Sequence, residues 1–172
     1  MSSRQSEGDL RDGGQELADG QEAGVPLRSG GGLGVDFRLH HMGSAVPELG
    51  PAAEILISLF GYRIVSGPFD DPLQKVSVLF LGMSPEGGVE LELVAPLTDD
   101  SPIRSILRKS GGGGYHACFE TADLHLALEH ARSRGCVVLG EPAAAVAFEG
   151  RRIAWIYTPA RQLFELLESA KA

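Results

Sequence analysis

The sequence predicts an α+β fold in which one βαβββ module occurs twice. Two observations support this prediction. The order of strand-like and helix-like patterns after Val35 is repeated once along the chain, and one histidine and one glutamate recur within the repeat. His41 and His116 open the two modules, 75 positions apart, while Glu92 and Glu165 lie near their ends, 73 positions apart. Since the flanking residues also match (LELV and FELL), the two halves are expected to share one plan.

The first module, about residues 35–97, begins with an alternating segment at 35–46 that predicts a strand. The segment 47–61 predicts a helix, which ends at a glycine. Three further strands, each bounded by Gly, Pro or Asp, are expected at 63–69, 74–82 and 89–96.

The second module, about residues 113–172, follows a short linker helix predicted at 101–110. A strand is expected at 115–121, and a helix at 123–135, where four apolar residues share one face (Leu124, Ala127, Leu128 and Ala131). The remaining strand set is expected within 136–142, 145–150, 151–159 and 161–169. The glycines at 111–114 lack the lysine and the following helix of a phosphate-binding loop, so they are expected to be a joint between the modules.

The composition of the chain excludes several classes of partner and location. The net charge of −8 argues against nucleic acid or an anionic membrane as a partner, and no apolar run has the length of a membrane span. The two cysteines form no CxxC pair, and the N-terminus shows no secretory signal, so a cytoplasmic location is expected. Residues 1–34 hold nine glycines and six acidic residues, which predicts a disordered tail before a domain at 35–172.

Strand alternation predicts where the polar side chains point. On 115–121, His116 and Cys118 share one face, whereas Tyr115 is expected on the opposite face, under a helix. His40 has the opposite parity to His41 and is expected to face away from it. If helices cover one side of each module, the other sides form a cup into which both histidines and both glutamates project.

Two imidazoles and two carboxylates suit a divalent metal ion of intermediate hardness. His41, Glu92, His116 and Glu165 are therefore the predicted ligands, and Co, Mn, Zn, Ni, Mg and Fe(II) all remain open as the metal. Four protein ligands in an octahedral shell would leave two positions for water or substrate oxygens, which is typical of a catalytic site.

The sequence also resembles the vicinal oxygen chelate (glyoxalase/bleomycin resistance/dioxygenase) superfamily over about residues 36–169. The segments that carry the resemblance are HHMGSAVPEL, ELELVAPLTDDSPIRSIL, GGGGYHACFETADLHLAL and LFELLE, and they are most similar to methylmalonyl-CoA epimerase-like members. The resemblance implies a half-barrel cup with the same four metal ligands, a homodimer, and an acyl-CoA or carrier-bound acyl thioester as substrate. It implies a metal-dependent epimerase or isomerase that removes the proton next to a carbonyl.

One departure from this resemblance concerns the general base. Where epimerase-like members carry a glutamate, DPLQKV at 71–76 places Leu73, which cannot accept a proton. Glu165 is therefore the predicted catalytic base as well as a ligand, with Asp70 and Asp71 as candidates whose simpler role is in a turn. A glyoxalase-like lyase acting on a thiol adduct, and a non-catalytic resistance-type binding protein, are the alternatives.

A weaker set of residues is predicted to contact substrate. Guanidinium groups suit carboxylates and phosphates, and a cysteine of the same parity as His116 can line the cup. The set comprises Leu73, Gln74, Cys118, Arg151 and Arg152.

Overall fold

The structure is a computed structural model that describes residues 35–85 and 87–170. The predicted tail at 1–34 lies outside these residues. The first half contains β1 (Arg38–Ala45), α1 (Leu49–Phe60), β2 (Arg63–Asp71), β3 (Val76–Gly82), β4 (Glu90–Pro96) and α2 (Ile103–Ser110). The second contains β5 (Gly113–Thr121), α3 (Leu124–Ser133), β6 (Val137–Ala144), the 3₁₀ turn η1 (Val146–Phe148), β7 (Arg152–Tyr157) and β8 (Leu163–Glu168).

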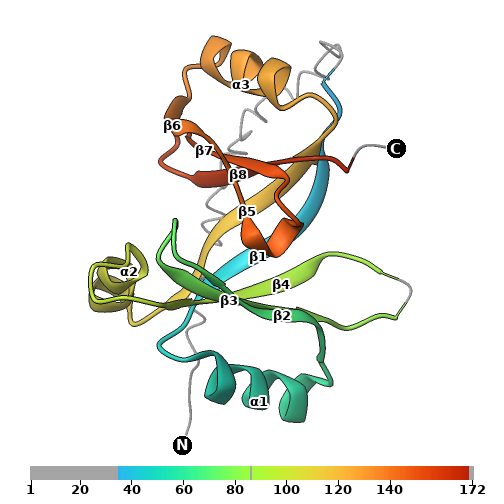
Figure 1. Cartoon of the computed structure of the whole chain (residues 1–172), viewed down its shortest axis with the longest axis vertical. Helices are drawn as coiled ribbons and strands as arrows, with labels where there is room; N and C mark the ends of the chain where they lie inside the picture. Colours follow the sequence, from blue (N-terminus) through green and yellow to red (C-terminus); the bar gives the residue numbers. More distant parts are fainter. Residues whose placement is uncertain (1–34, 86, 171–172) are drawn as a thin grey trace, which may run out of the picture. The chain divides into compact units, whose positions relative to one another are not determined.

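The strands form one eight-stranded sheet in the order β2-β3-β4-β1-β5-β8-β7-β6 (Figure 1). In each module the first strand pairs in parallel with the last, β1 with β4 and β5 with β8. The two modules join where β1 and β5 pair antiparallel. The predicted fold class, two βαβββ modules of a glyoxalase-like fold, is confirmed.

Local sequence explains how the helices begin and end. The Asp123 side chain accepts a hydrogen bond from the Leu126 amide at the start of α3, which caps that helix. Gly61 ends α1 with φ of 74°, a left-handed conformation that costs glycine little. The expectation of a strand at 145–150 was wrong, because Val146–Phe148 form the 3₁₀ turn η1 between β6 and β7.

Strand alternation divides the core into outer and inner layers. Leu79, Leu81 and Leu93 pack beneath α1, and α3 buries its predicted apolar face against β7 and β8. Alternate residues of the same strands, such as Val78 and Val94, face inward and contribute to a cluster that both modules share. The helices therefore cover the outer faces of the sheet, which leaves the inner faces for the site.

Two irregularities interrupt the β1–β5 pairing, and they are related by the repeat. On β1, Leu39 pairs with Phe119 and His41 with Cys118, so His40 is an extra residue. On β5, the pairing passes from His116 to Gly114, so Tyr115 is an extra residue. In both modules the residue just before the predicted ligand histidine therefore lies in a β-bulge, a feature that redirects side chains.

Candidate metal centre and cavity

The repeat sets the register of the four predicted ligands. Glu92 on β4 pairs with Gly43, two residues beyond His41, and Glu165 on β8 pairs with Cys118, two residues beyond His116. Each module therefore offers one histidine and one glutamate from neighbouring parallel strands. The antiparallel β1–β5 pair then brings the two sets together.

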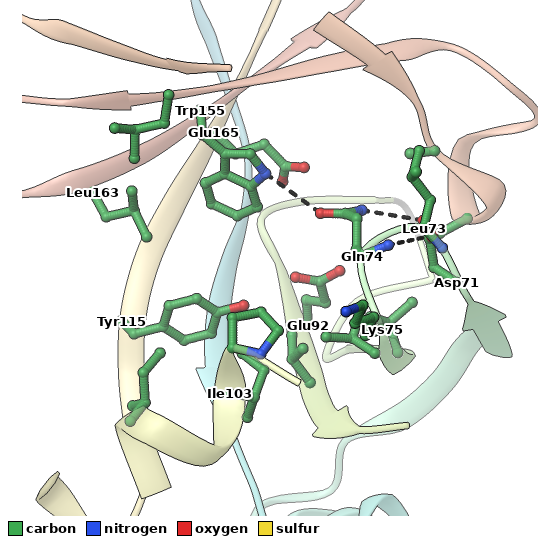
Figure 2. Close-up of a pocket in the computed structure, with 18 of the residues that line it drawn as sticks. Asp71, Leu73, Gln74, Lys75, Glu92, Ile103, Tyr115, Trp155, Leu163 and Glu165 are labelled. Carbon is green, nitrogen blue, oxygen red and sulfur yellow. Dashed lines mark hydrogen bonds between the residues drawn. The ribbon is translucent and has the colours of Figure 1, made fainter. Parts of the chain in front are cut away.

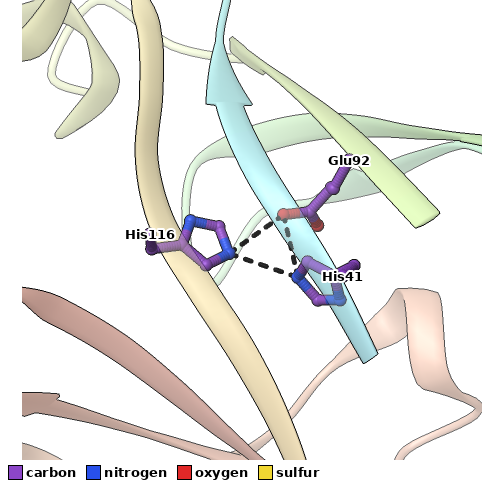
Figure 3. A group of neighbouring side chains, drawn as sticks. All are labelled: His41, Glu92 and His116. Carbon is purple, nitrogen blue, oxygen red and sulfur yellow. Dashed lines mark hydrogen bonds and ion pairs between the residues drawn. The ribbon is translucent and has the colours of Figure 1, made fainter. Parts of the chain in front are cut away.

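Each of the two histidines places its Nε2 atom close to the other histidine and to both glutamates. His41 Nε2 is 3.2 Å from His116 Nε2 and 3.4 Å from Glu92 Oε2 (Figure 3). It is also 3.2 Å from Glu165 Oε2. His116 Nε2 is 3.4 Å from Glu92 Oε2 and 3.6 Å from Glu165 Oε2. Two ligand atoms bound at about 2.1 Å to one divalent ion are separated by about 3.0–3.4 Å. The donor atoms of His41, Glu92 and His116 are 3.2–3.4 Å apart and fit such an ion, and Glu165 lies 3.2 Å from His41 and 3.6 Å from His116.

The site is buried and strongly charged. Burial alone lowers the pKa of His41, but the hydrogen bonds and charges of Glu165 and Glu92 outweigh it and raise this pKa to about 9. Burial raises the pKa of Glu165, but the hydrogen bonds from His116 and His41 outweigh it and lower this pKa to about 2. Without a metal ion, an imidazolium at His41 therefore neutralises part of the carboxylate charge.

Gly43 provides the space for the His116 ring. A Cβ atom added to Gly43 would lie 1.8 Å from His116 Cε1, far inside any contact distance. The ring also has edge-to-face contacts with Trp155 and Tyr115, at centroid distances of 4.9 and 4.5 Å. His116 Nδ1 is buried and has no hydrogen-bond partner among the described residues, so this ring is held by its packing and by the contacts of its Nε2 with His41 and the two glutamates.

A cavity of about 500 Å³ opens onto the two glutamates (Figure 2). Both modules line it, and most of its walls are apolar. The residues with polar side-chain groups in its lining are Asp71, Gln74, Lys75, Glu92, Asp100, Tyr115, Trp155 and Glu165. A small organic molecule in this cavity would contact the predicted metal site.

The cavity places two of the weaker candidates, Leu73 and Gln74, in its wall. The Leu73 side chain is 67% exposed. The Gln74 amide accepts a hydrogen bond from Trp155 Nε1 (3.4 Å) and donates one to Asp71 Oδ2 (3.1 Å), so it links the two modules. Asp71 also accepts hydrogen bonds from the backbone amides of Leu73 and Gln74, as expected of a residue that stabilises a turn.

Asp70, the other aspartate named as a candidate base, accepts a hydrogen bond from Ser77 and does not line the cavity.

The structure does not bring the other weak candidates into the cavity. Arg151 pairs with Glu120 at 3.0 Å, and Arg152 forms two bonds with Glu168 at 2.9 and 2.6 Å, so both guanidinium groups are engaged elsewhere. Cys118 is fully buried beside the donor atoms of His41 and Glu165. Burial, and next the charge of Glu165, raise the pKa of its thiol, which favours the protonated form.

Alternation misplaced two residues. Tyr115 lines the cavity and is not part of the apolar cluster beneath α3, and His40 contacts the His41 and Phe148 rings and does not face away. In both cases the residue is the unpaired extra residue of a β-bulge, so its side chain does not follow the alternation of the strand. No local sequence signal marks either bulge. Gly43, Trp155 and Phe148 were also not anticipated, although a glycine two residues after the first histidine was a visible clue.

A family model and individual sequence relatives both match this chain. A model described as the Glyoxalase/Bleomycin resistance protein/Dioxygenase superfamily matches residues 40–155. The ethylmalonyl-CoA/methylmalonyl-CoA epimerase of Cereibacter sphaeroides is 31% identical over 121 residues, which is 70% of this chain and 87% of that protein. The 2-epi-5-epi-valiolone epimerase of an Actinomyces species is 27% identical over 156 residues, covering 81% of this chain and 83% of that one.

Solved structures agree with the sequence relatives. The methylmalonyl-CoA epimerase of Mycobacterium tuberculosis superposes with a TM-score of 0.69 at 28% identity, covering 77% of this chain and 88% of that one. A methylmalonyl-CoA epimerase solved in complex with methylmalonyl-CoA and NH4+ has a TM-score of 0.67 at 28% identity, covering 77% and 94%. No helix within the described parts of the chain has the length and apolar character needed to cross a membrane.

Proposed function

The chain belongs to the glyoxalase/bleomycin resistance/dioxygenase superfamily, and we propose that within it the protein is a divalent-metal-dependent epimerase. The observation that carries this proposal is the convergence of His41, Glu92, His116 and Glu165 at one end of a cavity. Relatives named as epimerases of different substrates support the reaction type. The acyl thioester is the proposed substrate class, because several of these relatives are methylmalonyl-CoA epimerases.

A divalent ion bound by these four residues would polarise a substrate carbonyl and stabilise the negative charge that develops on its oxygen. Glu165 is the proposed base. It lines the cavity, where its carboxylate can contact a bound substrate. The two wall carboxylates that are not predicted ligands are engaged, Asp71 by three hydrogen bonds and Asp100 by Lys75.

Tyr115 is the proposed hydrogen-bond donor to substrate. Figure 2 shows its ring extending along the cavity wall. Its hydroxyl has no hydrogen-bond partner among the described residues, and burial, with the charges of Glu92 and Glu165, raises its pKa, which keeps the phenol neutral. The apolar walls and Trp155 would exclude bulk water around the reacting carbon, so that proton transfers take place among a few fixed groups.

Deuterium exchange tests this function. Metal-loaded protein is incubated in D₂O with methylmalonyl-CoA, and α-deuterium is measured by mass spectrometry. We expect exchange in the wild type and loss of exchange in His116→Ala, while a substitution of exposed Glu54 to Gln keeps the rate. Metal-loaded protein that catalyses no exchange would rule out this substrate. Turnover of a thiol–aldehyde adduct would then favour the lyase, and tight aromatic-ligand binding without turnover the resistance-type protein.

A homodimer is proposed as the assembly. Six large apolar side chains are exposed on α1 and the edge strand β2 that follows it, namely Ile55, Ile57, Leu59, Phe60, Ile64 and Val65. Exposed apolar groups beside a sheet edge favour self-association. Light scattering should give twice the chain mass, and Leu59→Glu should shift the protein to the monomer.

A further inference from the structure

His40 is the extra residue of the β1 bulge, next in the chain to one predicted metal ligand. The bulge turns its ring to the inner side of the sheet, where it is half-buried. It makes edge-to-face contacts with the rings of His41 and Phe148, at centroid distances of 5.2 and 5.5 Å. The Arg151 guanidinium in turn lies over the Phe148 ring, 5.3 Å from the ring centroid.

The His40 ring meets His41 through one nitrogen of each. His40 Nδ1 lies 3.0 Å from His41 Nδ1, a hydrogen-bond distance, whereas His41 Nε2 faces Glu92, Glu165 and His116. A neutral imidazole that binds a metal through Nε2 carries its proton on Nδ1. His41 Nδ1–H is therefore the donor of this bond, and His40 Nδ1 is the acceptor.

The second ligand histidine has no such support. His116 Nδ1 is buried without a partner in the described structure, and Tyr115, in the bulge related to that of His40, faces the cavity. Of the two repeated histidines, His41 alone has its outer nitrogen held by a side chain. Groups that hold the outer nitrogen of a ligand histidine commonly change metal affinity about 10- to 100-fold.

We propose that His40 is a positioning residue for the metal site: its Nδ1 accepts the proton of His41 Nδ1–H and keeps His41 Nε2 directed at the ion. This inference rests on the metal-binding role proposed above. The two β-bulges then have different roles. The first orients a ligand, and the second supplies Tyr115 to the cavity.

Metal affinity tests the proposal without any substrate. The dissociation constant for Zn²⁺ or Co²⁺ is measured by competition with a chromophoric chelator in the wild type, His40→Phe and His40→Gln. Phenylalanine keeps an aromatic ring but has no acceptor, whereas the glutamine amide oxygen restores one. We expect His40→Phe to weaken binding about 10- to 100-fold, and His40→Gln to recover at least part of the loss. His125→Ala is the matched control, since the His125 side chain is 80% exposed on α3.

Nitrogen-15 NMR of the zinc-loaded protein gives a signature of the bond itself. The His41 Nδ1–H proton should be protected from exchange with water in the wild type and in His40→Gln, and should exchange rapidly in His40→Phe. The proposal is overturned if His40→Phe binds metal within about twofold of the wild type, or if both variants lose equal affinity with a lowered melting temperature of the metal-free protein.

The metal-affinity experiment can succeed or fail independently of the deuterium-exchange assay. If methylmalonyl-CoA is not a substrate but His40→Phe weakens metal binding and His40→Gln rescues it, this inference stands and the proposed substrate falls. If the wild type binds no divalent ion, this inference and the metal dependence are both overturned.

Discussion

The imidazole of His116 lies directly over the Cα atom of Gly43, in the space that any larger residue would fill. The two residues pair across β1 and β5, the strands that join the modules. The position of a metal-ligand candidate in the second module therefore depends on the absence of a side chain in the first.

Gly43→Ala should abolish tight metal binding, with affinity falling at least about 100-fold, because the new Cβ would displace the His116 ring. Gly50→Ala is the matched control, since a Cβ there meets nothing within 4 Å. The control should keep its metal affinity and gain about 0.5–1 kcal/mol of stability, because alanine favours the helix. Chelator competition and thermal melts measure both. Equal metal affinity in the two variants would contradict the packing argument.

Glu165→Gln should lower the α-proton exchange rate about 10²- to 10⁴-fold at saturating metal, because it keeps an oxygen ligand but removes the proposed base. Glu92→Gln makes the same chemical change in the other module and should lower the rate less than about tenfold. The rates are compared only where metal analysis shows full occupancy. If the two variants lose activity equally, Glu165 is not the base.

Leu73→Glu should raise the exchange rate with methylmalonyl-CoA about tenfold or more, because it adds a carboxylate at the cavity wall, where a general base commonly contributes 10²–10⁴-fold. The side chain is 67% exposed, so the fold should tolerate the change. Leu73→Gln matches the size of the new side chain without adding a base. An equal effect of both variants would show that this position takes no part in proton transfer.

Tyr115→Phe should lower kcat/KM about tenfold, the cost of one hydrogen bond to substrate, while metal affinity stays unchanged. Tyr157→Phe removes a hydroxyl from a side chain that does not line the cavity, so it should keep wild-type kinetics. Steady-state kinetics and chelator competition are run on the same preparations. Unchanged kcat/KM in Tyr115→Phe would leave the hydroxyl without a role in binding.

The fold should lose stability in acid as the Glu120 carboxylate becomes protonated. Burial raises the pKa of this carboxyl, but the hydrogen bond from Arg38 and the charges of Arg38 and Arg151 outweigh it, so the folded pKa is below the usual 4.5. Its stabilisation is therefore full above 4.5 and is lost as pH falls from 4.5 through the lower folded value. Urea midpoints between pH 6 and pH 3 should fall more steeply for the wild type than for Glu120→Gln. Glu54→Gln, an exposed change on α1, should follow the wild type.

Much of this structure follows from periodicity and repetition. The alternation of Leu93 and Val94 between outer and inner layers, and the placement of α1 and α3, are visible in the sequence. The two bulges are not, because a bulge is set by pairing with a distant strand. They move His40 and Tyr115 to faces that alternation forbids.

The engagement of Arg151 could not be predicted either. Its partner Glu120 is 31 residues away in the sequence, on β5. Nothing near Arg151 in the chain distinguishes an arginine bound to a neighbouring strand from one free to bind substrate.

The predicted ligands are divided between the modules, so occupancy of the centre depends on the β1–β5 pairing, which among the described residues is the one strand pairing between the modules. Opening that pairing would separate His41 from His116 and leave each half with one imidazole and one carboxylate. A metal ion at 100 times its dissociation constant would therefore oppose this separation by about 2.7 kcal/mol. Metal binding at the proposed centre would then also stabilise the association of the two halves.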